Sequence, residues 1–231
     1  MKANPTRIFG ALLFVALLQA ISAAETYQAS LAAGDKLRTE GKADPALAEY
    51  VTATGQAAND TEKSLALGKQ GMVLAYDKKD YPAAAKLADE ALAIEGIQPV
   101  AEVTALQVRA ECEAKGEQNH ARAALALEKA LALKGVDWSR PGLLLSLGDS
   151  RRHLGKFHEA IKAYEEVLAT EGVPSPMKAV AHLNIGLTWQ YDLKDAAKAR
   201  SSYAAAVELN EGLKGEVDEH LGRLEPTTTT E

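Results

Sequence analysis

The sequence predicts an all-α fold, a right-handed α-solenoid of about five helix-turn-helix repeats with a C-terminal capping helix. One-sided helical segments recur along the chain, and the glycines that end them recur with the same spacing. No segment alternates apolar and polar residues as a half-buried strand does. The composition agrees, because 47% hydrophobic but only 5% aromatic residues suit closely packed helices with a core of mostly alanine and leucine.

The clearest helix covers residues 157–173. Ala160, Tyr164 and Val167 fall on one stripe at helical spacing, and polar residues fill the opposite side. Gly172 followed by an apolar residue is a common way to end a helix. This segment is therefore predicted to be a single helix that buries one side.

The same helix is found four more times in the sequence. The alanines equivalent to Ala160 are Ala46, Ala84, Ala123 and Ala199, and successive members of this series are 38, 39, 37 and 39 residues apart. The helix-ending glycines are Gly96, Gly135, Gly172 and Gly212, at intervals of 39, 37 and 40 residues. Because two independent markers share one period, we expect a tandem repeat.

Another apolar-periodic segment precedes each of these helices, so the unit is a helix pair. The residues expected to cap helix N-termini are Asp44, Asp60, Ser175 and Asp195. We expect a repeat domain over 25–225, with repeats at about 27–58, 61–97, 101–136, 141–173 and 177–212, a capping helix at 213–225 and a disordered tail at 226–231.

The unit resembles the tetratricopeptide repeat, a helix pair with Leu-Gly in its first helix, Gly at the turn, and Ala, aromatic, Ala along the second helix. In the fourth unit these positions are held by Leu147, Gly148, Gly155, Ala160 and Tyr164, with Val167 as the last small residue. The sequence departs from the family in its longer connections, in Lys79 where the turn glycine is expected, and in an enlarged turn in the third unit. These departures bear on the pitch of the solenoid.

The resemblance implies a scaffold or adaptor that binds a peptide or partner protein in a concave groove lined by the first helices. The groove positions carried over by alignment are Lys69, Gln70, Tyr76, Gln107, Asp149, Arg152, His153, Asn184, Gln190 and Tyr191. Taken singly, each of these residues can also be an ordinary solvated helix residue. The first unit has Leu31 and Asp35 where the family's clamp for a terminal carboxylate needs Lys and Asn, so binding of a free C-terminus is not supported.

The N-terminus reads as an export signal. Lys2 and Arg7 precede an apolar run over 8–21, which is short against the roughly 20 residues that a membrane span needs, and small residues follow to Ala24. We expect a signal peptide at 1–24 with cleavage after Ala23 or Ala24, a periplasmic or secreted location, and no transmembrane span in the mature chain. Loss of the two basic residues changes the formal net charge from −6 to −8, which disfavours nucleic-acid binding.

No catalytic or cofactor motif is found, so the sequence predicts a protein that is not an enzyme and needs no metal or cofactor. Cys112, the single cysteine, is interpreted as a small buried apolar residue. Trp189 is expected in the core, and Trp138, in a connection, is expected to fold back over helix ends rather than meet a partner. The alternative functions are a self-associating component of an envelope complex, which would be a homo-oligomer, and, less favoured, an enzyme or solute-binding protein.

Overall fold

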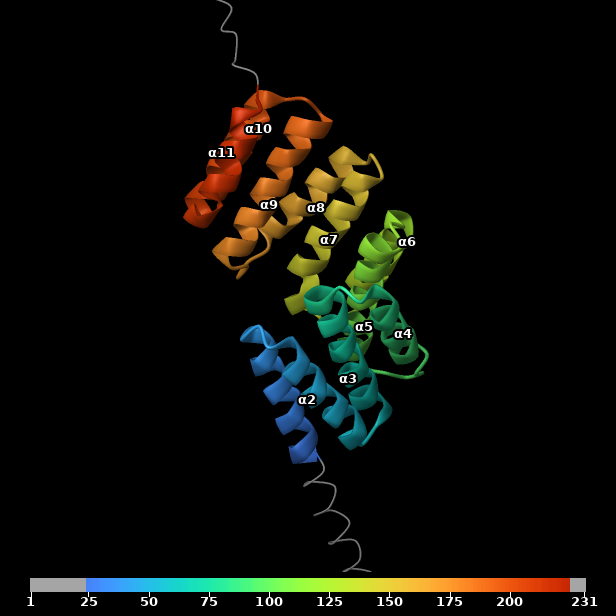
Figure 1. The fold of residues 1–231 in the computed structure, drawn as a ribbon. Coiled ribbons are helices and arrows are strands. Elements are labelled where there is room, and N and C mark those ends of the chain that lie inside the picture. The colour runs from blue at the N-terminus through green and yellow to red at the C-terminus, as the bar shows by residue number, and fades with distance from the viewer. Residues whose placement is uncertain (1–23, 225–231) are drawn as a thin grey trace, which may run out of the picture. The chain divides into compact units, whose positions relative to one another are not determined.

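The computed structural model describes residues 24–224, and every regular element in that range is a helix (Figure 1). The described chain forms two compact units that divide between Glu117 and Gln118. Both units contain consecutive antiparallel helix pairs, which confirms the prediction of helix-turn-helix repeats, but the two helices of the repeat predicted at 101–136 fall in different units. The tail predicted at 226–231 lies outside the described residues.

The first unit begins with a helix over residues 24–39. It continues with α2 (Ala43–Gln56), α3 (Asp60–Met72), a π-helical turn (Val73–Lys78), α4 (Tyr81–Leu92), α5 (Pro99–Glu111) and a second π-helical turn (Cys112–Gly116). Helix α3 packs against α2 of the preceding repeat, α4 of its own repeat and α5 of the next repeat (Figure 1).

The second unit has the same plan. Its elements are α6 (His120–Leu131), a 3-10 turn (Asp137–Ser139), α7 (Arg140–His153), α8 (Phe157–Ala169), α9 (Ser175–Leu187), a π-helical turn (Thr188–Asp192), α10 (Ala196–Leu209), a 3-10 turn (Glu211–Leu213) and α11 (Lys214–Gly222). Helix α7 packs on α6 and α8, α9 packs on α8 and α10, and α11 closes the unit against α10. No helix in the described residues is long and apolar enough to cross a membrane.

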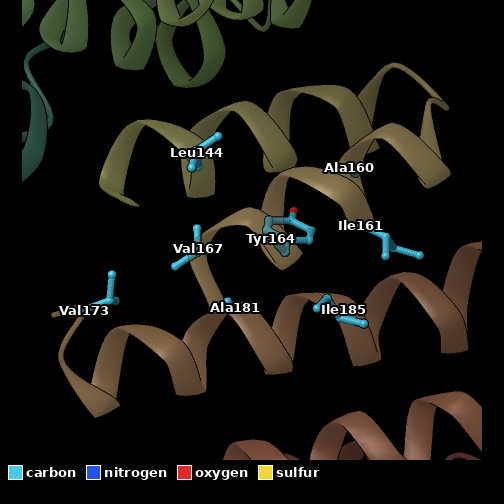
Figure 2. Close-up of a cluster of buried hydrophobic side chains, with 8 residues drawn as sticks. All are labelled: Leu144, Ala160, Ile161, Tyr164, Val167, Val173, Ala181 and Ile185. Atoms are coloured by element: carbon cyan, nitrogen blue, oxygen red, sulfur yellow. The ribbon is translucent and has the colours of Figure 1, made fainter. Parts of the chain in front are cut away.

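A buried tyrosine lies at the centre of the α7, α8 and α9 packing. Tyr164 is fully buried in a cluster that also contains Leu144, Ala160, Ile161, Val167, Val173, Ala181 and Ile185 (Figure 2). A Cβ atom on Gly148 would lie 2.3 Å from the Tyr164 ring, so only glycine leaves room for it. The same notch recurs between Gly34 and Tyr50 and between Gly186 and Tyr203, where the distance would be 2.5 Å.

The turns inside the repeats are of two kinds. In the first and fourth repeats, Gly41 and Gly155 both take a left-handed φ of 74° and end the first helix directly. In the second, third and fifth repeats the first helix ends in a π-helical turn, and a non-glycine residue takes the left-handed conformation. These residues are Lys79, Gln118 and Lys194, with φ of 59°, 51° and 60°.

One extra residue explains the difference between the two kinds of turn. The notch glycine precedes the central alanine by 12 residues in the fourth repeat (Gly148 to Ala160) but by 13 in the fifth (Gly186 to Ala199). A π-helical turn absorbs one inserted residue without shifting the helices on either side. Lys79 stands five residues before Ala84, as Gly155 stands five before Ala160, so Lys79 takes the place of the turn glycine and the extra residue lies in the π-helical turn before it.

Several predicted helix ends are wrong by a residue or more. Asp195 caps α10 as predicted by accepting a hydrogen bond from the Lys198 amide, but Asp44, Asp60 and Ser175 lie inside the first turns of their helices. The caps that were missed are Asn59, Asp80 and Asn119. Gly96, Gly135 and Gly172 do take left-handed φ values, whereas Gly212 lies in a 3-10 turn and donates to the Asn210 side chain.

Candidate interaction surface on the first helices

The candidate surface is built on an aspartate that directly follows the notch glycine. Asp35 Oδ1 accepts hydrogen bonds from the Tyr50 hydroxyl at 2.6 Å and from Lys69 Nζ at 2.6 Å. Tyr50 comes from the second helix of the same repeat and Lys69 from the first helix of the next. The carboxylate therefore joins three helices at one point.

The second unit repeats this arrangement. Asp149 Oδ1 accepts from the Tyr164 hydroxyl at 2.7 Å and from Asn184 Nδ2 at 3.1 Å. The helices that supply these groups, α7, α8 and α9, correspond in repeat position to those of the first unit. The first and fourth repeats therefore share one hydrogen-bonding scheme around an equivalent aspartate.

An arginine one turn further along completes each copy. Arg38 Nε donates to Asp77 Oδ2 at 2.7 Å, and Arg152 Nε donates to Asp192 Oδ2 at 2.5 Å. Both acceptor aspartates lie in π-helical turns of the following repeat. We call these two sets of residues the Asp35 network (Asp35, Arg38, Tyr50, Lys69, Asp77) and the Asp149 network (Asp149, Arg152, Tyr164, Asn184, Asp192).

The two networks are related by a nearly constant displacement along the chain. Asp35, Arg38 and Tyr50 precede their counterparts by 114 residues, and Lys69 and Asp77 precede theirs by 115. The sequence signal is the repeated pattern Gly-Asp-x-x-Arg, which reads GDKLR at 34–38 and GDSRR at 148–152. This pattern could have identified Arg38, which the sequence analysis did not select, but it does not contain Asp77 or Asp192.

The tyrosines act as hydrogen-bond donors and stay neutral. Burial raises the pKa of Tyr50, and its hydrogen bond to Asp35 raises the pKa further. Burial also raises the pKa of Tyr164, together with the negative charge of Asp149. A neutral tyrosine keeps each aspartate oriented, so the carboxylate group has a fixed direction.

The polar groups of both networks remain partly accessible to solvent. The side chains of Arg38 and Asp77 are each 31% exposed, and those of Arg152 and Asp192 are 28% and 21% exposed. Asp35, Arg38 and Asp77, together with Thr39, line an open hollow on the first unit. These charges are ordered by their partners and still accessible to an incoming chain.

Four of the predicted groove residues belong to these networks: Lys69 lies in the Asp35 network, and Asp149, Arg152 and Asn184 lie in the Asp149 network. Gln70 and Gln190 are instead buried, 7% and 6% exposed, so they were wrongly placed on the surface. Gln70 donates to the Thr54 hydroxyl, and Gln190 accepts from the Tyr203 hydroxyl. Both amides therefore satisfy buried partners between helices.

The other predicted residues contact neighbouring helices. The Tyr76 hydroxyl donates to the backbone oxygen of Gln107 at 3.4 Å, which is a long bond. Tyr191 lies 2.9 Å from Nδ1 of His220 on α11. His153 stacks on His120, with ring centroids 4.0 Å apart. These residues border the two networks without joining them.

The cysteine and the tryptophans differ in outcome. Cys112 is buried as expected, and burial raises the pKa of its thiol to about 11. Trp189 is partly buried against the core, with Lys198 Nζ 4.0 Å from its ring centroid. The prediction that Trp138 folds back is wrong, because this side chain is 64% exposed on its 3-10 turn. In residues 24–224, no three His, Cys, Asp or Glu side chains are grouped as metal ligands would be.

No family model matches the chain, and no curated protein matches it. Solved structures do match. TTC0263, a thermophilic TPR protein in Thermus thermophilus, is 18% identical with a TM-score of 0.65, over 84% of this chain and 98% of that one. YrrB, described as a TPR protein with an unusual peptide-binding site, is 18% identical with a TM-score of 0.57, over 90% and 97%.

A crystal structure of MamA matches with 22% identity and a TM-score of 0.57, over 79% of this chain and 96% of that chain. At these identities the likeness concerns the fold. The antiparallel helix pairs, the glycine notches that receive tyrosines, and these structural matches all agree. The chain has the tetratricopeptide-repeat fold.

Proposed function

We propose that this protein is an exported scaffold that binds a peptide or a partner protein through its first helices. We call the first-helix surface of each unit its first-helix face: it carries the Asp35 network in the first unit and the Asp149 network in the second. The observation that carries the proposal is the duplication of a partly exposed network whose charges are already held in place. Ordered polar groups bind a ligand at a smaller cost in side-chain entropy than mobile ones do. YrrB is described as having a peptide-binding site, and this chain would bind a peptide with its first helices.

The charge balance of the two networks favours a polar ligand of mixed character. The Asp35 network holds two aspartates, one arginine and one lysine, and the Asp149 network holds two aspartates and one arginine. A peptide with alternating donors and acceptors can meet both the arginines and the carboxylates. A uniformly acidic ligand would be repelled by the four aspartates and by the net charge of the chain.

Export is supported by the sequence alone. The basic residues Lys2 and Arg7, the apolar run over 8–21 and the small residues up to Ala24 form a signal-peptide pattern. These residues lie outside the described range, apart from Ala24. A partner in the periplasm or outside the cell follows from this proposal.

The test is affinity capture from an envelope extract of the source organism with residues 25–231 as bait. The variant carries Arg38→Glu and Arg152→Glu, and the matched control carries Lys86→Glu and Lys162→Glu, exposed residues of second helices. We expect one protein to be retained by the parent chain and the control and lost by the variant, with circular dichroism unchanged. If the variant retains the captured protein as well as the parent chain does, the first-helix face is not the binding surface.

A further inference from the structure

We propose that the groove between α10 and α11 binds one amphipathic helix of a partner protein, which takes the place of the second helix of a sixth repeat. This site is separate from the first-helix face. The inference rests on the position of α11 in the repeat pattern, on the open groove beside it, and on the way the preceding first helices are covered.

Helix α11 occupies the position of a first helix. Residues 215–225 read GEVDEHLGRLE and residues 101–111 read AEVTALQVRAE, so they agree at both glutamates, the valine and the arginine. The displacement is again 114 residues. Val103 and Val217 are both buried, 0% and 2% exposed. By sequence and burial, α11 is the counterpart of α5.

The contacts of α11 with the preceding repeat support this equivalence. Tyr76 donates to the backbone oxygen of Gln107 on α5. Its counterpart Tyr191 lies against His220 on α11, and Gln190 donates to the His220 backbone oxygen at 2.8 Å. Each tyrosine thus meets the next first helix at nearly the same point. Helix α11 therefore continues the stacking of the first helices.

The preceding first helices in this unit are each covered by a second helix of their own repeat. Helix α7 packs against α8, and α9 packs against α10. No helix follows α11 in the described residues, and the sequence that continues at 226–231, PTTTTE, has no apolar stripe. Within the described chain, the flank of α11 that a second helix would cover is open.

That flank forms an apolar groove of about 420 Å³. Its floor is made by Tyr203, Ala204, Val207, Val217 and Leu221. On the rim, Lys214 pairs with Asp218 at 2.9 Å, so these two charges offset each other, and Arg200 adds one positive charge at the edge of the groove. An apolar strip of this kind fits the apolar face of a helix better than it fits a charged ligand.

The repeats themselves define which helix would fit. Second helices bury a small residue, a second residue four positions later, and a small residue three positions after that, as in Ala84, Ala88 and Ala91 of α4. Tyrosine in the middle position needs a glycine notch. The equivalent position on α11 is Leu224, counted from Ala110 of α5, so the notch is closed. The occupant should therefore have a small middle residue, as α4 does.

The probe is a fluorescein-labelled peptide of residues 80–95, which contains α4, titrated with residues 25–231 in fluorescence anisotropy. The variant is Ala204→Arg, which fills the groove from an exposed position, and the control is Ser201→Arg, exposed on the same helix outside the groove. We expect saturable binding that Ala204→Arg weakens at least tenfold and Ser201→Arg leaves within twofold. A peptide of residues 156–171, with Tyr164 in the middle position, should bind more weakly.

Absent binding, or binding that Ala204→Arg does not change, would overturn the proposal. Light scattering of the parent chain distinguishes a second copy: a concentration-dependent dimer abolished by Ala204→Arg would assign the groove to self-association instead of a partner. The Arg38→Glu, Arg152→Glu variant should bind the probe normally. If the capture experiment shows that the first-helix face does not bind the partner, the result for the groove between α10 and α11 is therefore unaffected.

Discussion

The Asp35 and Asp149 networks have the same frame but differ in one partner. Both anchor an aspartate with a tyrosine seated in a glycine notch, yet the third partner is Lys69 in the first copy and Asn184 in the second. The difference shows that steric fit fixes the geometry, while the neighbouring first helix sets the charge. The first copy is formally neutral and the second carries one net negative charge.

The largest expected effect comes from closing the notch that both copies share. Gly148→Ala places a methyl group 2.3 Å from the fully buried Tyr164 ring, and overpacking this severe costs about 3 kcal/mol or more in unfolding free energy. Gly34→Ala should cost a similar amount in the first copy. Urea denaturation measures both.

Gly142→Ala is the matched control, because a Cβ there meets nothing within 4 Å and alanine favours a helix over glycine. It should leave the protein as stable as before or more so. If Gly148→Ala is equally harmless, the Tyr164 ring can move aside, and the glycine notch does not fix its position.

Removal of the tyrosine hydroxyl should destabilise the two networks by different amounts. Hydrogen bonds to charged groups contribute about 1.5–3 kcal/mol, so Tyr50→Phe and Tyr164→Phe should both destabilise. Tyr164→Phe should cost more, because Asp35 keeps the full positive charge of Lys69 whereas Asp149 keeps the amide of Asn184. Equal losses in denaturation would show that the third partner does not matter.

Exchange of the third partner should give a smaller effect that depends on salt. Lys69→Asn removes a partly exposed ion pair of about 0.5 kcal/mol and copies the second network into the first. The loss should shrink between low and high ionic strength, because salt screens the pair. Asn184→Lys is the reciprocal variant, and its gain should shrink in the same way. A loss that is constant with salt would argue against an electrostatic role.

The smallest effect should appear with pH in the second unit. His182 stands where the first unit has the buried Leu67, and burial lowers the pKa of His182. A lowered pKa in the folded state means that stability is complete above about pH 6.5, the unfolded value, and falls as the pH drops below it. His182→Leu should flatten that fall in thermal denaturation from about pH 8 to about pH 5. An unchanged slope would assign the acid sensitivity to other groups.

The sequence was sufficient for the helix pairs because the apolar stripes and the small residues in them repeat at helical spacing. It was insufficient for the turns, since a π-helical turn needs no special residue and shows itself only as one extra position between Gly186 and Ala199. Helix starts failed at Asp44 and Ser175 because these residues entered the first turn instead of preceding it.

The same reason limited the prediction of the surface. Lys69, Asp149 and Asn184 lie in regular α-helix, where alignment preserves the direction of the side chain. Gln70 also lies in regular α-helix but is buried, so alignment alone did not decide which side chains are exposed. Asp77 and Asp192 lie in π-helical turns, where the extra residue rotates the side chains that follow. Gln190, in one of these turns, accordingly faces a buried partner.

The π-helical turns also explain how a repeat protein can tolerate insertions and deletions. A residue gained or lost where two helices of a repeat join can be taken up within one turn, so the helices beyond it keep their contacts with their neighbours. The effect of an insertion or deletion is thereby confined to the turn in which it occurs. An engineer could exploit these elbows as places to insert a tag or a cleavage site, with the rest of the stack left in register.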